Sequence, residues 1–368
     1  MRRFASKIRE YVPLFSLIVF IITLISLIIY LIFINNTGFA DYFNYNVTAP
    51  TRAVMAWLMV IFPFSVAELF LVLSPIIIAI LIVLAVKFGK RSSKSTIKFF
   101  SVLVSVLCFL FITFVWTFSS GYYTTPIDEK LELNTEGIGK SELKETADII
   151  ISNLNELSKY IEYDESNASI MPYSYDEMSK RICVAYEAFA EKYDILKSFD
   201  SRIKPIALSE PMTYTHISGV YTFMTGEANV NVNYPDFVVA SSSAHEMAHQ
   251  RGIARENEAN FVSFLVLSES EDHFLKYSAY LDVYGYVLNA LYSEDKELYL
   301  QAVSNLDAKV RNDRISYSEF FKKYQDSTMS EVADKVNNSY LQANGQQAGT
   351  RSYGMVTELA CAYLTKEG

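Results

Sequence analysis

A five-residue segment of this chain has the residue types and the spacing of a metal-dependent hydrolytic site. The segment is His245-Glu246-Met247-Ala248-His249, and it uses two of only four histidines in the chain. On a helix, positions i and i+4 lie on one face, so His245 and His249 can bind a single metal ion. Zinc suits imidazole nitrogen, and a catalytic zinc site has three protein ligands and one place left for water. Glu246 would then act as general base toward that water.

The third ligand must come from another part of the chain, and an acidic side chain is the best candidate. A site of the pattern His-x-x-Gly-x-x-His would require histidine at position 255, where this chain has Arg255. The residues that follow offer Glu256 and Glu258 as alternative ligands. Gly252, three residues after His249, is a place where the helix can end and the chain can turn back.

The segment Glu256-Asn257-Glu258-Ala259-Asn260 resembles the third-ligand segment of the gluzincin metallopeptidases, Glu-x-x-x-Asp. That resemblance implies Glu256 as the third ligand, with Asn260 in place of the aspartate that orients a ligand histidine. An asparagine can accept a hydrogen bond from an imidazole but brings no charge. The resemblance favours Glu256 over Glu258, and the glutamate that does not bind metal would pair with a nearby arginine or lie on a solvated helix face.

A wider set of residues is similar to an uncharacterised bacterial membrane-protein family. The matching stretches are Pro211–Tyr214, Gly219–Tyr221, Thr225–Asn231, His245–Gly252 and Ser352–Gly354. Members of that family have N-terminal membrane spans followed by a zincin-like domain of unknown function. The resemblance implies the fold and the metal site, and it supplies no substrate.

Three stretches upstream of the motif are apolar enough to cross a bilayer as helices, which takes about 20 residues each. They are approximately residues 12–34, 69–86 and 99–118. The first is interpreted as a retained signal anchor, because its apolar core is too long for a cleaved signal peptide. Basic residues concentrate before it, at Arg2, Arg3, Lys7 and Arg9, and in the loop 87–98. The positive-inside rule therefore places the N-terminus and this loop in the cytoplasm and everything after the third span outside.

The chain is accordingly divided into a transmembrane region (1–120), a linker (121–140) and an extracytoplasmic domain (141–368). Helical apolar spacing dominates the domain. Residues 220–224 and 228–233 flank a Thr-Gly turn and predict a β-hairpin directly before the motif. The predicted fold class is mainly α: a three-helix transmembrane region followed by a largely helical, zincin-like α+β domain with a small β-hairpin.

Residues 229–233 are interpreted either as an edge strand above the metal or as part of a plain structural hairpin. In the first case, Asn229 and Asn231 would bind an extended peptide that adds to the sheet through main-chain hydrogen bonds. A metallopeptidase also needs a donor that steadies the oxyanion. The sequence leaves several candidates for that role: Tyr214, His216, Tyr221 and Tyr353.

Charge and cysteine content narrow the function further. The net charge of −9 argues against a nucleic-acid partner, which would require a clustered basic face. Cys183 and Cys361 are far apart in sequence, and such a pair is more often two buried thiols than a disulfide. The predicted partners are the lipid bilayer and a protein or peptide substrate, and the sequence gives no indication of the oligomeric state.

These observations predict a membrane-anchored zinc metallopeptidase that hydrolyses peptide or other amide bonds outside the cytoplasmic membrane, with Zn²⁺ as cofactor. Glu246 favours an enzyme, because a purely structural zinc needs no base beside its ligand. The alternative is a non-catalytic membrane protein that binds zinc or a peptide, as a sensor or an envelope component.

Overall fold

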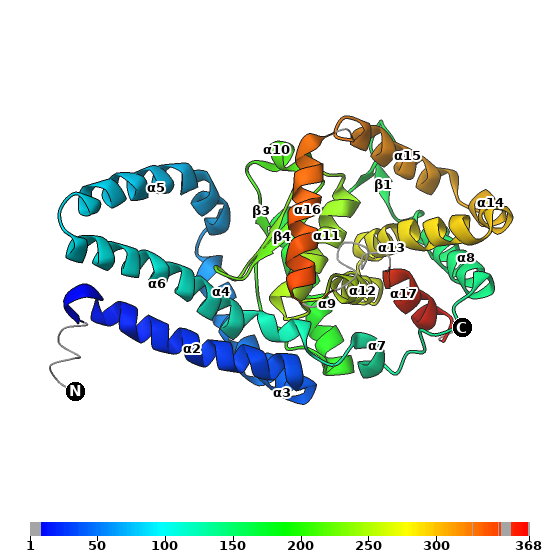
Figure 1. Ribbon diagram of the computed structural model, residues 1–368. Helices are drawn as coiled ribbons and strands as arrows, with labels where there is room; N and C mark the ends of the chain where they lie inside the picture. Colours follow the sequence, from blue (N-terminus) through cyan, green and yellow to red (C-terminus); the bar gives the residue numbers. More distant parts are fainter. Residues whose placement is uncertain (1–8, 326, 345, 347–354, 367–368) are drawn as a thin grey trace.

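The computed structural model describes residues 9–325, 327–344, 346 and 355–366. An elongated group of N-terminal helices extends from one side of a mostly helical domain (Figure 1). Arg2, Arg3, Lys7, and Ser352–Gly354 with the oxyanion candidate Tyr353, lie outside the described residues.

Three of the N-terminal helices are long and apolar enough to cross a membrane. They are α2 (Leu14–Asn35), α5 (Val66–Gly89) and α6 (Ser93–Thr117). They coincide with the three predicted spans, although α5 and α6 begin earlier than the apolar runs alone suggest. No residue of α5 is buried against the protein. A continuous apolar surface of this kind is stable in a bilayer and not in water.

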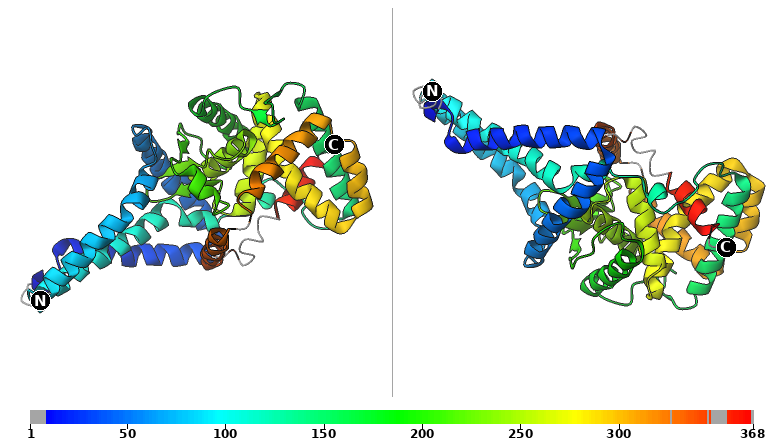
Figure 2. Two further views of the ribbon diagram at one scale, coloured as in Figure 1. Left: turned by 90° about the horizontal axis from the view of Figure 1, so that it is seen from above. Right: turned by 90° about the horizontal axis from the view of Figure 1, so that it is seen from below.

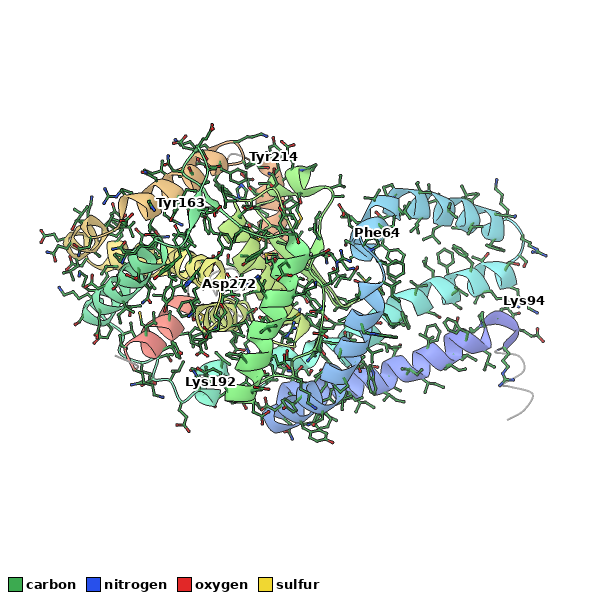
Figure 3. All side chains as sticks on the ribbon, turned by 180° about the vertical axis from the view of Figure 1, so that it is seen from behind. Phe64, Lys94, Tyr163, Lys192, Tyr214 and Asp272 are labelled. Carbon is green, nitrogen blue, oxygen red and sulfur yellow. The ribbon has the colours of Figure 1, made fainter. Side chains whose placement is uncertain are left out.

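The two ends of these spans differ in character. Lys94 forms an ion pair with Glu10, at 3.1 Å, so the start of the chain and the basic loop lie together. Figure 3 shows Lys94 at the tip farthest from the domain and Phe64 at the end that adjoins it. The shorter elements α3 (Thr37–Phe43), η1 (Asn44–Thr48) and α4 (Ala49–Val60) connect the first two spans at the domain end, as the two views in Figure 2 show.

The domain consists of helices packed around a small sheet. Its helices are η2 (Ser119–Tyr122), α7 (Ile127–Lys130), α8 (Lys140–Leu157), α9 (Tyr175–Tyr193), α10 (Ser209–Thr213), α11 (Asp236–Gln250), α12 (Glu256–Ser268), α13 (His273–Glu294), α14 (Lys296–Ser304), α15 (Ala308–Lys322), α16 (Thr328–Ala343) and α17 (Val356–Leu364). Its strands are β1 (Glu162–Tyr163), β2 (Ser169–Ile170), β3 (Lys204–Pro205), β4 (Gly219–Thr222) and β5 (Glu227–Val230). Helix α12 is buried along most of its length, and its apolar residues from Phe261 to Leu267 belong to the main core.

The predicted hairpin is present, but its strands have other places in the sheet than expected. Strands β4 and β5 pair antiparallel, β3 pairs parallel to β5, and the order is β3-β5-β4. The interpretation of residues 229–233 as an edge strand is therefore wrong, since β5 is central and β4 is the edge. Asn229 and Asn231 are buried and donate to the carbonyls of Val220, at 3.0 Å, and Ile217, at 3.1 Å. They hold β4 and the preceding loop instead of facing a peptide.

The segment predicted as a linker, 121–140, is packed into the domain. Ile127 is 2% exposed and belongs to the main core. Gly121 lies so close to the carbonyl oxygen of Gly252 that an added Cβ would be 2.5 Å from it. The chain leaves the third span directly onto the turn that follows the motif, and its carbonyl groups satisfy donors there. The segment that the sequence sets apart as a linker therefore lies against the domain that follows it.

Polar contacts attach the spans to the sheet. The buried carboxylate of Glu227, at the start of β5, accepts hydrogen bonds from the backbone N–H groups of Val66, at 3.0 Å, and Ala67, at 2.9 Å. A carboxylate at this place also complements the positive end of the α5 dipole. Lys204 of β3 donates to the carbonyl of Met59, at 2.7 Å, and to that of Phe62. The membrane region and the domain therefore form one connected structure.

Candidate metal centre

Two helices and the turn between them place the residues of the motif. Helix α11 begins after Pro235 and carries Asp236 in its first turn, where a negative charge suits the helix dipole. His245 and His249 lie one turn apart near its C-terminal end. The chain then reverses at Gly252, whose φ of 97° favours glycine. Helix α12 starts at Glu256 and so returns this side chain to the face of α11 that carries the histidines.

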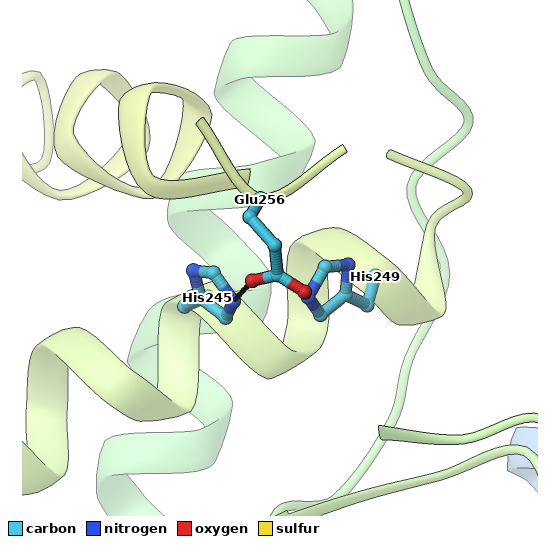
Figure 4. A group of neighbouring side chains, drawn as sticks. All are labelled: His245, His249 and Glu256. Carbon is cyan, nitrogen blue, oxygen red and sulfur yellow. Dashed lines mark ion pairs between the residues drawn. The ribbon is translucent and has the colours of Figure 1, made fainter. Parts of the chain in front are cut away.

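The carboxylate of Glu256 lies between the two imidazole rings (Figure 4). Its Oε2 is 3.2 Å from His245 Nε2, and its Oε1 is 3.6 Å from His249 Nε2. The ligand atoms of all three residues lie within 4.8 Å of one another. A tetrahedral zinc ion with ligand distances of about 2.0–2.1 Å separates neighbouring donors by roughly 3.3–3.4 Å. The two separations between carboxylate and imidazole, one from each oxygen of Glu256, bracket that value, so the types and proximity of these donors are compatible with zinc.

The hydrogen bond of His249 fixes its tautomer. His249 Nδ1 is 2.7 Å from the carbonyl oxygen of Ile253, which can only accept, so Nδ1 carries the proton and Nε2 faces Glu256. This is the orientation that a metal-binding imidazole needs. The sequence assigned such an orienting bond to Asn260. Asn260 lines the same cavity, but the hydrogen bonds among the described residues give it no contact to a ligand histidine, and its Nδ2 and His245 Nδ1 are both buried without a partner.

The electrostatics of the cluster favour a bound cation. Burial alone would lower the pKa of His249, but the adjacent Glu256 carboxylate outweighs it and raises the pKa to about 9. Burial likewise opposes the charge of Glu256, yet the two imidazoles hold the pKa of this carboxyl far below its usual range. The carboxylate thus attracts positive charge strongly, and a divalent ion would displace a proton from this place.

Of the two glutamates left open by the sequence, the structure brings Glu256 to the histidines. Glu258 turns the other way. Its Oε1 accepts a hydrogen bond from Arg255, at 2.6 Å, and another from the backbone N–H of Ile127, at 3.1 Å. Arg255 also donates to the carbonyls of Tyr122, at 3.1 Å, and Thr124, at 2.6 Å. The arginine that replaces a third histidine therefore fastens the 121–140 segment to α12.

Glu246 packs directly against the edge strand. It is 6% exposed, and a Cβ on Gly219 of β4 would lie 2.6 Å from its Cγ and its Oε1. Burial raises the pKa of Glu246, and this effect is opposed by the two histidines and by a hydrogen bond from the backbone N–H of Tyr221. A carboxylate with a raised pKa, beside two histidines and against an edge strand, has the properties of a general base.

His245, Glu246, His249 and Glu256 line one cavity of about 1120 Å³. Several other residues that line it were not identified from the sequence. Asp282 and Tyr286 of α13 line it one helical turn apart. Burial raises the pKa of Asp282 to about 6, against the effect of His245. The sequence signal that could have found them is the four-residue spacing of Asp282 and Tyr286, which puts both on one face of an otherwise apolar helix. Phe118 and Tyr122, just after the third span, form another wall, and α16 forms the one opposite β4.

The three oxyanion candidates that lie in the described residues, Tyr214, His216 and Tyr221, have other partners or none. His216 Nε2 is 2.8 Å from the carbonyl oxygen of Tyr324, to which it must donate. Tyr214 packs its ring against Tyr324. The hydroxyl of Tyr221 is buried without a partner, and its ring packs against Phe118.

The fold and the cluster together define a helical protein with three helices able to cross a membrane and a domain that holds two histidines and a glutamate in one cavity. The chain belongs to the family described as protein of unknown function DUF3810, which matches residues 43–361. That range covers the second and third spans, the junction and the whole cluster. Searches of curated proteins and of solved structures gave no match.

Proposed function

We propose that the protein is a membrane-anchored zinc metallopeptidase with a zincin-like site, which hydrolyses peptide bonds outside the cytoplasmic membrane. One observation carries the proposal: the ligand atoms of His245, His249 and Glu256 lie within 4.8 Å of one another, and Glu246 lines the same cavity. Two histidines and a glutamate are a common ligand set of catalytic zinc. The basic loop at the far end of the spans supports the external location of the domain.

The side chains divide the work as follows. His245, His249 and Glu256 supply the ligands, and a bound zinc ion supplies polarisation of a carbonyl and a lowered pKa of water. Glu246 accepts the proton that the water loses when its oxygen bonds to the carbonyl carbon. It then gives this proton to the amine nitrogen as the C–N bond breaks. The outer edge of β4, apart from the Tyr221 N–H that donates to Glu246, offers main-chain groups that hold an extended substrate beside Glu246.

The direct test uses the full-length protein purified in detergent. We expect about one zinc ion per chain by metal analysis, and cleavage of a random peptide pool that stops when a chelator removes the metal. Absence of bound zinc would contradict the proposal at its base. Zinc without cleavage of any peptide would contradict the peptidase and favour a non-catalytic zinc-binding protein of the membrane.

Loss of a residue that orients a metal ligand weakens metal binding by a factor of about 10–100. Replacing Glu256 by Gln changes a ligand itself and is expected to weaken zinc binding by more than that factor. The carboxylate that both histidines face is lost in this variant. The matched control is Glu258→Gln, which changes a carboxylate of the same helix turn that faces Arg255 and whose side chain is 6% exposed, against 13% for that of Glu256. Zinc titration of both variants measures the difference, and equal affinities would rule out Glu256 as the ligand.

Replacing Gly219 by Ala is expected to lower kcat by about 100-fold, the loss that a displacement of about 1 Å causes in a catalytic group. The new Cβ would displace the Glu246 carboxylate from β4, whereas neither histidine lies among its nearest neighbours. Zinc content should therefore stay at the wild-type level. Gly89→Ala is the control, because nothing lies within 4 Å of a Cβ there. A wild-type kcat in Gly219→Ala would mean that Glu246 acts from another position.

A further inference from the structure

The lengths of the spans put the candidate metal centre at the level where the spans would leave a membrane. A helix crosses the hydrocarbon layer in about 20 residues. Lys98 is the last charged residue before the apolar part of α6. Counting about 20 residues from the position after Lys98 gives a span that ends at Phe118, the residue that caps α6. In α5 a similar span which ends before Lys87 begins at Ala67. The ring of Phe118 is 6.0 Å from the ring of His249, and the N–H of Ala67 binds Glu227 at the base of β5.

The edge strand runs from this level to the proposed base. The turn after β4 lies on the membrane region, because Phe223 packs 5.2 Å from Phe114 of α6 and Gly226 abuts Met55 of α4. At its other end, Gly219 abuts Glu246. Within the described residues no strand pairs with the outer edge of β4. A peptide that pairs with this edge therefore has one end at the membrane surface and the other at the metal donors.

Both walls of this path expose apolar side chains. Val220 of β4 is 42% exposed and lines the cavity. Across the cavity, Met329, Val332 and Val336 of α16 are 53%, 62% and 65% exposed and line it as well. Figure 1 shows α16 in front of α11. An apolar helix face that is left in water and turned toward a catalytic cavity fits the apolar side chains of a substrate.

We propose that the substrate is a polypeptide anchored in the same membrane, cut in an apolar, extended stretch next to its anchor. The inference rests on the proposed peptidase function and names its substrate class. The four residues of β4 span about 13 Å at 3.3 Å per residue. The bond that is cut therefore lies roughly 4–8 residues from the membrane boundary. Anchoring also raises the concentration of such a segment at a cavity that opens at this level.

The test uses the full-length, zinc-loaded protein in lipid vesicles with synthetic peptide pools. Each pool carries randomised positions that follow an apolar transmembrane anchor directly or after a polar spacer of about 30 residues, and a third pool lacks the anchor. Fragments are identified by mass spectrometry. We expect cuts about 4–8 residues from the anchor and at least 10-fold slower cleavage of the other two pools. Equal rates for anchored and free pools, or cuts spread evenly along the spacer, would overturn the inference.

A pair of variants tests the apolar wall itself. Val336→Asp places a charge on the cavity face of α16 and is expected to lower kcat/KM for the anchored pool by about 10-fold. Ser339→Asp places the same charge on an exposed position of this helix outside the cavity and is the control. Equal rates for the two variants would show that α16 does not contact the substrate.

A binding measurement separates this inference from the proposed function. Glu246→Gln protein with a photo-crosslinker at Val220 is expected to capture the anchored pool in preference to the free pool. Cleavage without preference for anchored peptides would overturn only the substrate class. If wild type cleaves no pool and Glu246→Gln captures none, both the peptidase and the substrate class are wrong.

Discussion

Replacing Glu246 by Gln is expected to slow peptide hydrolysis by about 100- to 10,000-fold while zinc content stays unchanged, because a general base contributes a factor of that size. Glutamine keeps the shape of the side chain, which packs against Gly219, but it cannot take a proton from water. The proton then has no acceptor next to the carbonyl under attack. The measurement is kcat on the peptide pool, together with metal analysis of the same sample.

The comparison with Glu258→Gln makes the result specific. Glu246 is 6% exposed and Glu258 is 5% exposed, but only Glu246 lines the cavity. The control should retain the wild-type kcat, or lose stability without losing zinc-dependent turnover in the folded fraction. A Glu246→Gln protein with wild-type kcat would assign the base to another residue, and Asp282 would be the first to examine, since it lines the same cavity.

The proximity of His245 and His249 was predictable because it depends only on local helix geometry. Two histidines at i and i+4 share a helix face by geometry alone, and the glycine three residues later marks the reversal. The choice between Glu256 and Glu258 was not local. It depended on Arg255 and on the backbone N–H of Ile127, which lies 131 positions before Glu258. Both donate hydrogen bonds to Glu258. A pattern can suggest such a choice by resemblance, but only the packing of distant segments decides it.

The sheet and the cavity walls show where pattern reasoning fails. The hairpin followed from alternation and a Thr-Gly turn, but strand order depends on β3, two residues long and too short to have a signature. Its pairing with β5 makes β4 the edge and buries Asn229. The segment 121–140 is held to the domain largely by hydrogen bonds of irregular backbone, and such backbone leaves no periodic pattern in the sequence. From the sequence alone, a packed irregular segment therefore looks the same as a linker.

Replacing Arg52 by Met is expected to destabilise the protein by about 2–6 kcal/mol, which corresponds to a fall in Tm of about 5–15 °C. Arg52 is fully buried, and burial lowers its pKa to about 10, so it stays charged at neutral pH. Its guanidinium donates to the carbonyls of Thr117, at 2.9 Å, and Arg251, at 3.1 Å. Without it, both acceptors are buried and unpaired, at a cost of about 1–3 kcal/mol each.

The position of Arg52 makes this more than a stability effect. It joins the end of the third span, at Thr117, to the turn that carries the chain from His249 to Glu256. Zinc occupancy should therefore fall together with Tm in Arg52→Met. The matched control is Arg202→Met, which breaks the ion pair between Arg202 and Asp176. These two side chains are 32% and 59% exposed, so losing the pair should cost about 0–1 kcal/mol of stability. Thermal unfolding and metal analysis in detergent measure both. Equal Tm values for the two variants would mean that the membrane region and the metal turn are held together by other contacts.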